Sequence, residues 1–92
     1  MQTQLTQFQD YLLGSGFTLL SSIDYAWRIS KIAEKEGITL ESLSKELQRY
    51  LQEYGRQGQK WMIGKKSHAS YYNALKQFRK FVLVQRFGGV NG

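Results

Sequence analysis

The chain has 92 residues, no cysteine, no proline and a formal net charge of +6. This length suits one domain, and the absence of cysteine excludes a disulfide framework, thiolate chemistry and a cysteine metal site. No apolar run approaches the roughly 18–20 residues of a membrane span, and the first ten residues lack the basic-then-apolar form of a signal peptide. We therefore expect a cytoplasmic helical domain over residues 1–87, with no cofactor and no membrane partner. Residues 88–92 are expected to form a glycine-rich tail or the start of an interdomain linker.

Charge is distributed unevenly along this short chain. Residues 1–46 contain four basic and six acidic residues, a net of −2, whereas residues 47–92 contain nine basic residues and one acid, a net of +8. Such asymmetry within one domain favours a partner of negative charge more strongly than a uniformly basic composition does. The alternative is that the lysines simply solvate the surface.

Glycines divide the chain into four predicted helices. In the first, Leu5, Phe8 and Leu12 recur at helical spacing, and the Gly14-Ser15-Gly16 run ends it. The second is predicted over residues 23–36, with Ser21 or Ser22 as N-cap and Gly37 at its end. Its apolar residues cover most of the helix circumference, so we expect it in the middle of the bundle. These residues are Ile23, Ala26, Trp27, Ile29, Ile32 and Ala33.

The third predicted helix is a single one that ends at Gly55, with leucines and tyrosines on one face and Thr39, Ser42 or Ser44 as its N-cap. The fourth is predicted to begin at Ser67 as N-cap and to run to about Phe87 before Gly88-Gly89. Between them, residues 55–66 contain three glycines, four cations and no acid. A connection of this length more often marks function than simple linkage. Its Trp61-Met62-Ile63 cluster is expected to turn back onto the bundle.

The fourth helix separates an apolar face from a basic face. Tyr71, Ala74, Leu75, Phe78 and Val82 share one sector, which predicts a core-facing side. The opposite sector carries Lys76, Arg79 and Lys80 beside Tyr72 and Asn73. Lys60, Lys65 and Lys66 of the preceding loop are expected to converge on the same side.

These features together favour nucleic acid as the partner. Clustered cations release counterions from a duplex, and a helix start with Ser67, His68 and Ser70 offers donors to a phosphate. An α-helix also fits the major groove, where Tyr72, Asn73, Lys76 and Arg79 are placed to reach base edges.

The segment "KSHASYYNALKQFRKFV" resembles the last helix of the core-binding domain of tyrosine recombinases, or phage integrases. Asn73-Ala74-Leu75, Phe78 and Phe81 match the pattern of that helix. Upstream, "FQDYLLGSGFTLLSSIDYAWRISKIAEKEGI" is similar to the opening of the family, and "TLESLSKELQRYLQEYG" is similar to its third helix. The resemblance covers about residues 5–87.

The resemblance implies an all-α fold, a compact four-helix bundle of the SAM-like type that forms half of a clamp around duplex DNA in integration and recombination. The second and fourth helices would lie against the DNA, and other recombinase protomers would be further partners. The expected DNA-binding residues, from the periodicity and the resemblance together, are Arg28, Lys31, Lys35, Lys60, Lys65, Lys66, Ser67, Tyr72, Asn73, Lys76, Arg79 and Lys80.

We do not expect catalysis by this domain itself, because the resemblance places recombination chemistry in a separate domain. His68 is the single histidine, and the carboxylates are expected on solvated faces. Tyr11, Tyr50, Tyr54 and Tyr71 are interpreted as core or core-edge residues.

The alternative to a DNA-binding domain is a small helical protein–protein interaction or dimerisation module. Trp61, Phe81 and Phe87 would be its exposed aromatic residues. Phe81 and Leu83 are predicted to lie off the main core sector, which would leave apolar area for an interface.

Overall fold

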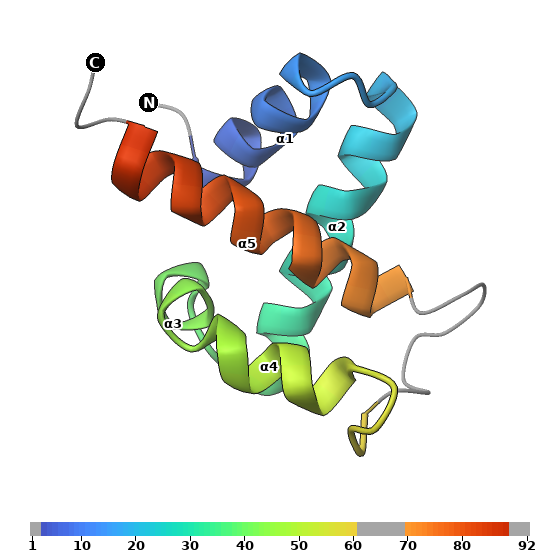
Figure 1. Ribbon diagram of the computed structural model, residues 1–92. Helices are drawn as coiled ribbons and strands as arrows, with labels where there is room; N and C mark the ends of the chain where they lie inside the picture. The colour runs from blue at the N-terminus through green and yellow to red at the C-terminus, as the bar shows by residue number, and fades with distance from the viewer. Residues whose placement is uncertain (1–2, 61–69, 89–92) are drawn as a thin grey trace.

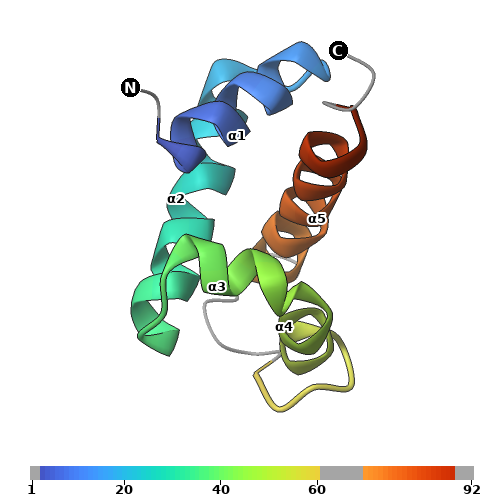
Figure 2. The same cartoon turned by 90° about the vertical axis from the view of Figure 1, so that its left-hand side faces the viewer.

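The computed structural model describes residues 3–60 and 70–88. Within these ranges the chain forms five helices and no strand, α1 (Gln4–Gly14), α2 (Leu19–Glu36), α3 (Leu40–Lys45), α4 (Leu47–Tyr54) and α5 (Ser70–Gly88). Helix α5 contacts each of the other four helices, and α2 contacts α1, α3 and α5 (Figures 1 and 2). The all-helical class is therefore confirmed, and α5 rather than α2 is the helix with the most neighbours.

Three threonines begin the first three helices in the same way. Thr3, Thr18 and Thr39 each accept a hydrogen bond from the backbone N–H three residues later, at 3.1 Å. Each bond satisfies an N–H that has no partner within its own helix. The predicted N-cap at Ser21 or Ser22 is wrong, because α2 begins at Leu19 behind Thr18. Ser22 instead lies buried within the helix and donates its hydroxyl to the Thr18 carbonyl at 2.9 Å.

The predicted helix ends at Gly14-Ser15-Gly16 and Gly37 are confirmed. Gly37 has a φ of 68°, and the N–H of Ile38 after it reaches back to the carbonyl of Ala33 at 3.0 Å. This left-handed turn provides hydrogen bonds to carbonyls at the end of α2 that would otherwise lack a partner. It favours glycine because a Cβ is strained at such a φ.

The third predicted helix is divided in two, which corrects the expectation of four helices. Glu46, with φ −113° and ψ 27°, interrupts it, and α3 and α4 run in different directions on either side (Figure 2). Leu43 and Leu47 are both buried across the break. Neither glycine nor proline stands there, so the bend follows from packing two short apolar faces onto the same core.

The core lies where α1, α2 and α4 meet α5. Phe8 and Phe78 are fully buried, with ring centroids 5.2 Å apart in an edge-to-face arrangement. Phe81 belongs to the same cluster, only 4% exposed and with its ring centroid 5.4 Å from that of Phe8. The expectation that Phe81 lies off the core is therefore wrong. Phe8 and Tyr11 of α1 cover the side of α5 that carries Phe81, and the periodicity of α5 alone does not reveal this contact.

Helix α2 is buried on one side only. Its buried apolar residues are Ala26, Ile29, Ile32 and Ala33, whereas Ile23 is 44% and Trp27 51% exposed. The expectation that apolar residues around most of the circumference place this helix in the middle of the bundle is therefore wrong for these two side chains. The radius of gyration, 12.8 Å, is close to the roughly 12 Å of a compact domain of this length.

Candidate nucleic-acid interface

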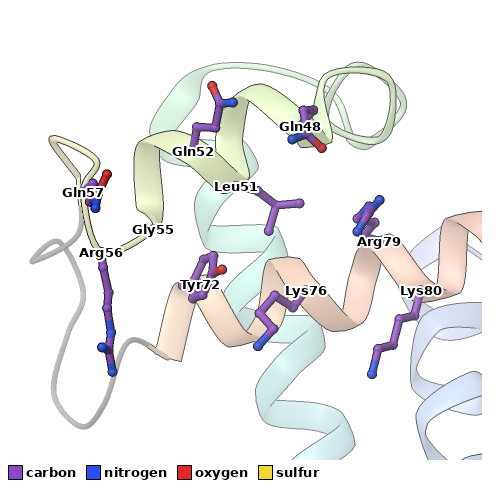
Figure 3. A pocket seen from close by; sticks show the side chains of 10 residues that line it. All are labelled: Gln48, Leu51, Gln52, Gly55, Arg56, Gln57, Tyr72, Lys76, Arg79 and Lys80. Atoms are coloured by element: carbon purple, nitrogen blue, oxygen red, sulfur yellow. The ribbon is translucent and has the colours of Figure 1, made fainter.

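A groove of about 680 Å³ lies between α4 with its following turn and α5 (Figure 3). Figure 3 shows the side chains of α4 on one side of it, those of α5 on the other, and Leu51 extending between the two helices. We call it the basic groove. Its lining residues are Gln48, Leu51, Gln52, Gly55, Arg56, Gln57, Tyr72, Lys76, Arg79 and Lys80.

Among the described residues, four cations and no carboxylate line the basic groove. Lys76, Arg79 and Lys80 come from three exposed positions of α5, and Arg56 comes from the turn after α4. Within residues 3–60 and 70–88, none of these four side chains forms an ion pair with an acid. The Nζ atom of Lys76 lies 5.4 Å from the centre of the Tyr72 ring. The groove therefore presents positive charge that no acid in the described part of the chain neutralises.

The bottom of the basic groove is apolar and tightly packed. Leu51 and Tyr72 are half-buried and Gly55 is buried. A Cβ at Gly55 would stand 2.8 Å from the Leu51 carbonyl oxygen and 3.5 Å from a ring carbon of Tyr72. Glycine at this position therefore lets the chain turn closely past the Leu51 carbonyl at the end of α4, while the distance to Tyr72 is an ordinary van der Waals contact.

A cluster of charged side chains outside the basic groove fixes the turn after α4. The Nζ atom of Lys60 lies 2.6 Å from Glu36 Oε2 and 2.8 Å from Glu53 Oε1. Tyr54 donates its hydroxyl to Glu36 at 2.9 Å. We call Glu36, Glu53, Tyr54 and Lys60 the Lys60 cluster. It connects the segment after α4 to the end of α2, 24 residues earlier in the chain.

The pKa values in the Lys60 cluster follow from these contacts. Hydrogen bonds from Lys60 and then Arg49 lower the pKa of Glu53 below its ordinary 4.5. Hydrogen bonds to Glu36 and Glu53 raise the pKa of Lys60 above its ordinary 10.5. Burial, reinforced by the hydrogen bond to Glu36, raises the pKa of Tyr54. These shifts in pKa favour an ionised Glu53, a protonated Lys60 and a protonated Tyr54 hydroxyl, which are the forms that make the contacts.

Lys60 is therefore placed differently from the expectation. Two carboxylates hold its ammonium, and it does not line the basic groove. The expectation that all carboxylates lie on solvated faces is also wrong, because the Glu36 side chain is only 12% exposed. The interpretation of the tyrosines is confirmed, since Tyr50 and Tyr54 are buried and Tyr11 and Tyr71 half-buried.

The basic residues of α2 do not line the groove. Arg28 pairs with Asp24 at 2.9 Å and lies 6.0 Å from the Tyr71 ring centre, on the side where α2 meets α5. Lys31 pairs with Glu34 at 3.5 Å and lies over Trp27 at 5.4 Å. Lys35 is exposed in the last turn of α2.

Of the remaining expected residues, Asn73 is half-buried on α5 and does not line the basic groove. Lys65, Lys66 and Ser67, together with His68 and Trp61, lie outside the described residues, and so does the predicted helix start at Ser67.

Sequence reasoning missed one whole side of the groove. Gln48, Gln52, Arg56 and Gln57 are exposed and line it from α4 and its turn. The sequence did contain a signal. Residues 48–59 include four glutamines and two arginines but a single acid, Glu53. Periodicity assigns these residues to solvent, and only the pairing of α4 with α5 shows that they face a cationic surface.

No protein-family model matches the chain, and neither do curated proteins or solved structures. In residues 3–60 and 70–88, no helix combines the length and apolarity needed to cross a membrane.

Proposed function

We propose that this domain binds double-stranded DNA through the basic groove, as the core-binding domain of a tyrosine recombinase, and that it does not catalyse recombination itself. One observation carries the proposal. Four cations from α5 and from the turn after α4 line a single groove without a carboxylate or an ion pair among the described residues. The resemblance of residues 66–82 to the last helix of that family supports the same proposal, as does the all-helical fold, for which we propose the SAM-like arrangement.

Duplex DNA suits this groove for electrostatic reasons. Each phosphate that a cation neutralises releases a condensed counterion, so the logarithm of the binding constant falls with the logarithm of salt by about 0.9 per contact. Four contacts would give a slope near −3.6, or roughly a hundredfold weaker binding between about 50 and 200 mM salt. Binding of this kind is independent of base sequence and precedes any base contacts.

A salt titration with two matched variants tests the proposal. Fluorescence anisotropy with a labelled duplex would compare Lys76→Gln/Lys80→Gln with Lys45→Gln/Arg86→Gln. All four positions are exposed and both pairs change the net charge equally, but only the first pair lines the groove. We expect the first pair to reduce the salt slope by about 2 and the second to leave it unchanged. Salt-insensitive binding, or equal slopes in the two variants, contradicts the proposal.

A second candidate function is self-association through α2. Leu20, Ile23 and Trp27 follow one another at helical spacing and are 79%, 44% and 51% exposed. An antiparallel second copy of α2 centred between Ile23 and Asp24 would place Leu20 of one copy beside Trp27 of the other, so the apolar strip can pair with itself. This strip replaces the interface expected from Trp61, Phe81 and Phe87. Phe81 is buried and Trp61 lies outside the described residues, although Phe87 is 67% exposed.

Sedimentation velocity over a concentration series separates the two candidates. Trp27→Glu would abolish a dimer formed through α2, whereas Val84→Glu, at an equally exposed position on α5, would not. A chain that stays monomeric at all concentrations eliminates this second candidate and leaves the DNA proposal unaffected.

A further inference from the structure

Three uncharged glutamines line the basic groove beside its four cations, so the groove offers hydrogen-bond donors as well as positive charge. Gln48, Gln52 and Gln57 are exposed on the α4 side, opposite Lys76 and Arg79 on α5 (Figure 3). A glutamine amide has two N–H donors and an arginine guanidinium has five. These donors can bond to the DNA backbone whatever the base sequence is. Both sides of the groove therefore present hydrogen-bond donors to whatever occupies it.

The spacing of the helices decides which part of a duplex can enter. Packed helices lie about 8–10 Å apart, and the major groove of B-DNA, about 12 Å wide, accepts a single helix. With α5 in the major groove, α4 cannot enter beside it and must lie over the edge of that groove. The edge is a sugar–phosphate strand, so this strand runs between α4 and α5.

The lining chemistry of the groove matches such a strand. Phosphate oxygens only accept hydrogen bonds, which suits the amide and guanidinium donors, and no carboxylate of the described residues lines the groove to repel them. Leu51 and Tyr72 supply an apolar surface at the bottom, against which a deoxyribose can pack.

We infer that the basic groove holds one sugar–phosphate strand of the duplex, with Gln48, Gln52 and Arg56 donating to it from the α4 side and Lys76 and Arg79 from the α5 side. The inference rests on the proposed function and adds to it a second side of contact and the part of the DNA that is contacted. It assigns α4 to the DNA interface, in addition to the helices expected from the sequence.

Replacing donors by carboxylates tests the α4 side. Gln48→Glu/Gln52→Glu keeps the side-chain length but places two negative charges against the strand. With a labelled random-sequence duplex of about two helical turns, we expect Kd to rise about tenfold or more. The matched control is Gln9→Glu/Gln85→Glu, which changes the net charge equally on α1 and α5 outside the groove. We expect the control to bind almost as wild type does. Circular dichroism melting of every variant confirms that it is folded.

Neutral truncation gives a second, independent readout. Gln48→Ala/Gln52→Ala removes donors without changing charge, so we expect a Kd several-fold higher with an unchanged salt slope. This variant also decides the question if the two glutamates prevent folding.

The outcomes separate the inference from the proposed function. If Lys76→Gln/Lys80→Gln weakens binding but both Gln48/Gln52 variants bind as the control does, the groove does not hold the strand, and the DNA lies on the outer face of α5 alone. If none of these variants weakens binding, the proposed function fails together with the inference.

Discussion

Replacing Lys60 by methionine removes a charge from the structure while preserving most of the side-chain length. The Lys60 ammonium contacts Glu36 at 2.6 Å and Glu53 at 2.8 Å, and its side chain is 29% exposed. After the substitution, Glu36 keeps the hydroxyl of Tyr54, and Glu53 keeps the contact from Arg49 at 2.9 Å. Both carboxylates therefore lose their shared partner without becoming wholly unpaired.

The magnitude follows from how far the cluster is buried. Removing one partner of a fully buried ion pair costs about 3–5 kcal/mol, whereas an exposed pair contributes about 0.2–1 kcal/mol. The Glu36 side chain is 12% exposed and that of Glu53 28%, between these limits. We expect Lys60→Met to lower the free energy of unfolding by about 1–2 kcal/mol, or Tm by roughly 5–15 °C for a chain of this size.

Urea denaturation followed by circular dichroism measures this loss. Lys45→Met is the matched control, because its ammonium pairs with Glu41 at 3.4 Å and both side chains are mostly exposed. The control should lose at most about 0.5 kcal/mol. Equal losses in the two variants would show that the Lys60 cluster contributes no more than a surface pair.

The same variant decides whether Lys60 contacts DNA. Two carboxylates already neutralise its ammonium, so the salt slope of DNA binding should be the same in Lys60→Met and in wild type. A slope reduced by about 1 would mean that Lys60 leaves the cluster and neutralises a phosphate, as the sequence alone suggested.

Three further predictions concern the scaffold and its pH dependence. Thr18→Ala should cost about 1 kcal/mol in urea unfolding through the lost N-cap, whereas Ser21→Ala should cost little, because Thr18 and not Ser21 caps α2. Phe78→Ala should cost about 3–5 kcal/mol, because the ring is fully buried; a loss below that of Thr18→Ala would contradict the packing. Stability should fall below pH 4.5, because the pKa of Glu53 is lowered and protonation removes its ion pairs. It should also fall above pH 10.5, because the pKa of Lys60 is raised and deprotonation removes the same contacts. Urea midpoints that are flat across both ranges would contradict these assignments.

Local rules predicted much of the scaffold from the sequence. The spacing of Phe8, Leu12, Leu75 and Phe78 identified side chains that are fully buried, and Gly37 ended its helix as expected. These features depend on backbone geometry and on the period of one helix, both of which a sequence displays directly. The start of α2 was misplaced because Thr18 and the serines that follow are all good N-caps.

The features that the sequence did not predict depend on which helices pack against one another. Helix α1 covers Phe81, and Glu36 draws Lys60 across 24 residues, and neither contact leaves a periodic signal. The break at Glu46 has no glycine or proline to announce it. The basic side of α5 was visible in the sequence, but the opposite side of the groove became visible only when α4 was placed against α5.

Counting charges along the sequence overstates what the domain can offer to a polyanion. Residues 47–92 contain nine cations, but Arg49 is paired with Glu46 and Glu53, and Lys60 with Glu36 and Glu53. The pairing of Lys60 also has a use, because it holds one end of the segment that follows α4. Within that segment the N–H of Gly58 bonds to the Gly55 carbonyl at 2.9 Å, and the N–H of Lys60 bonds to the Glu53 carbonyl at 2.8 Å.

Arg56 lies in this fixed turn, so a bound phosphate need not order it first, which lowers the entropic cost of binding. Lys60 thus helps to position Arg56, and among the described residues the groove keeps four cations. A salt slope of about −3.6 follows from these four cations, whereas nine phosphate contacts would give about −8. A measured slope near −8 would mean that DNA binding breaks the Lys60 cluster, and that the turn carrying Arg56 is not fixed in the complex.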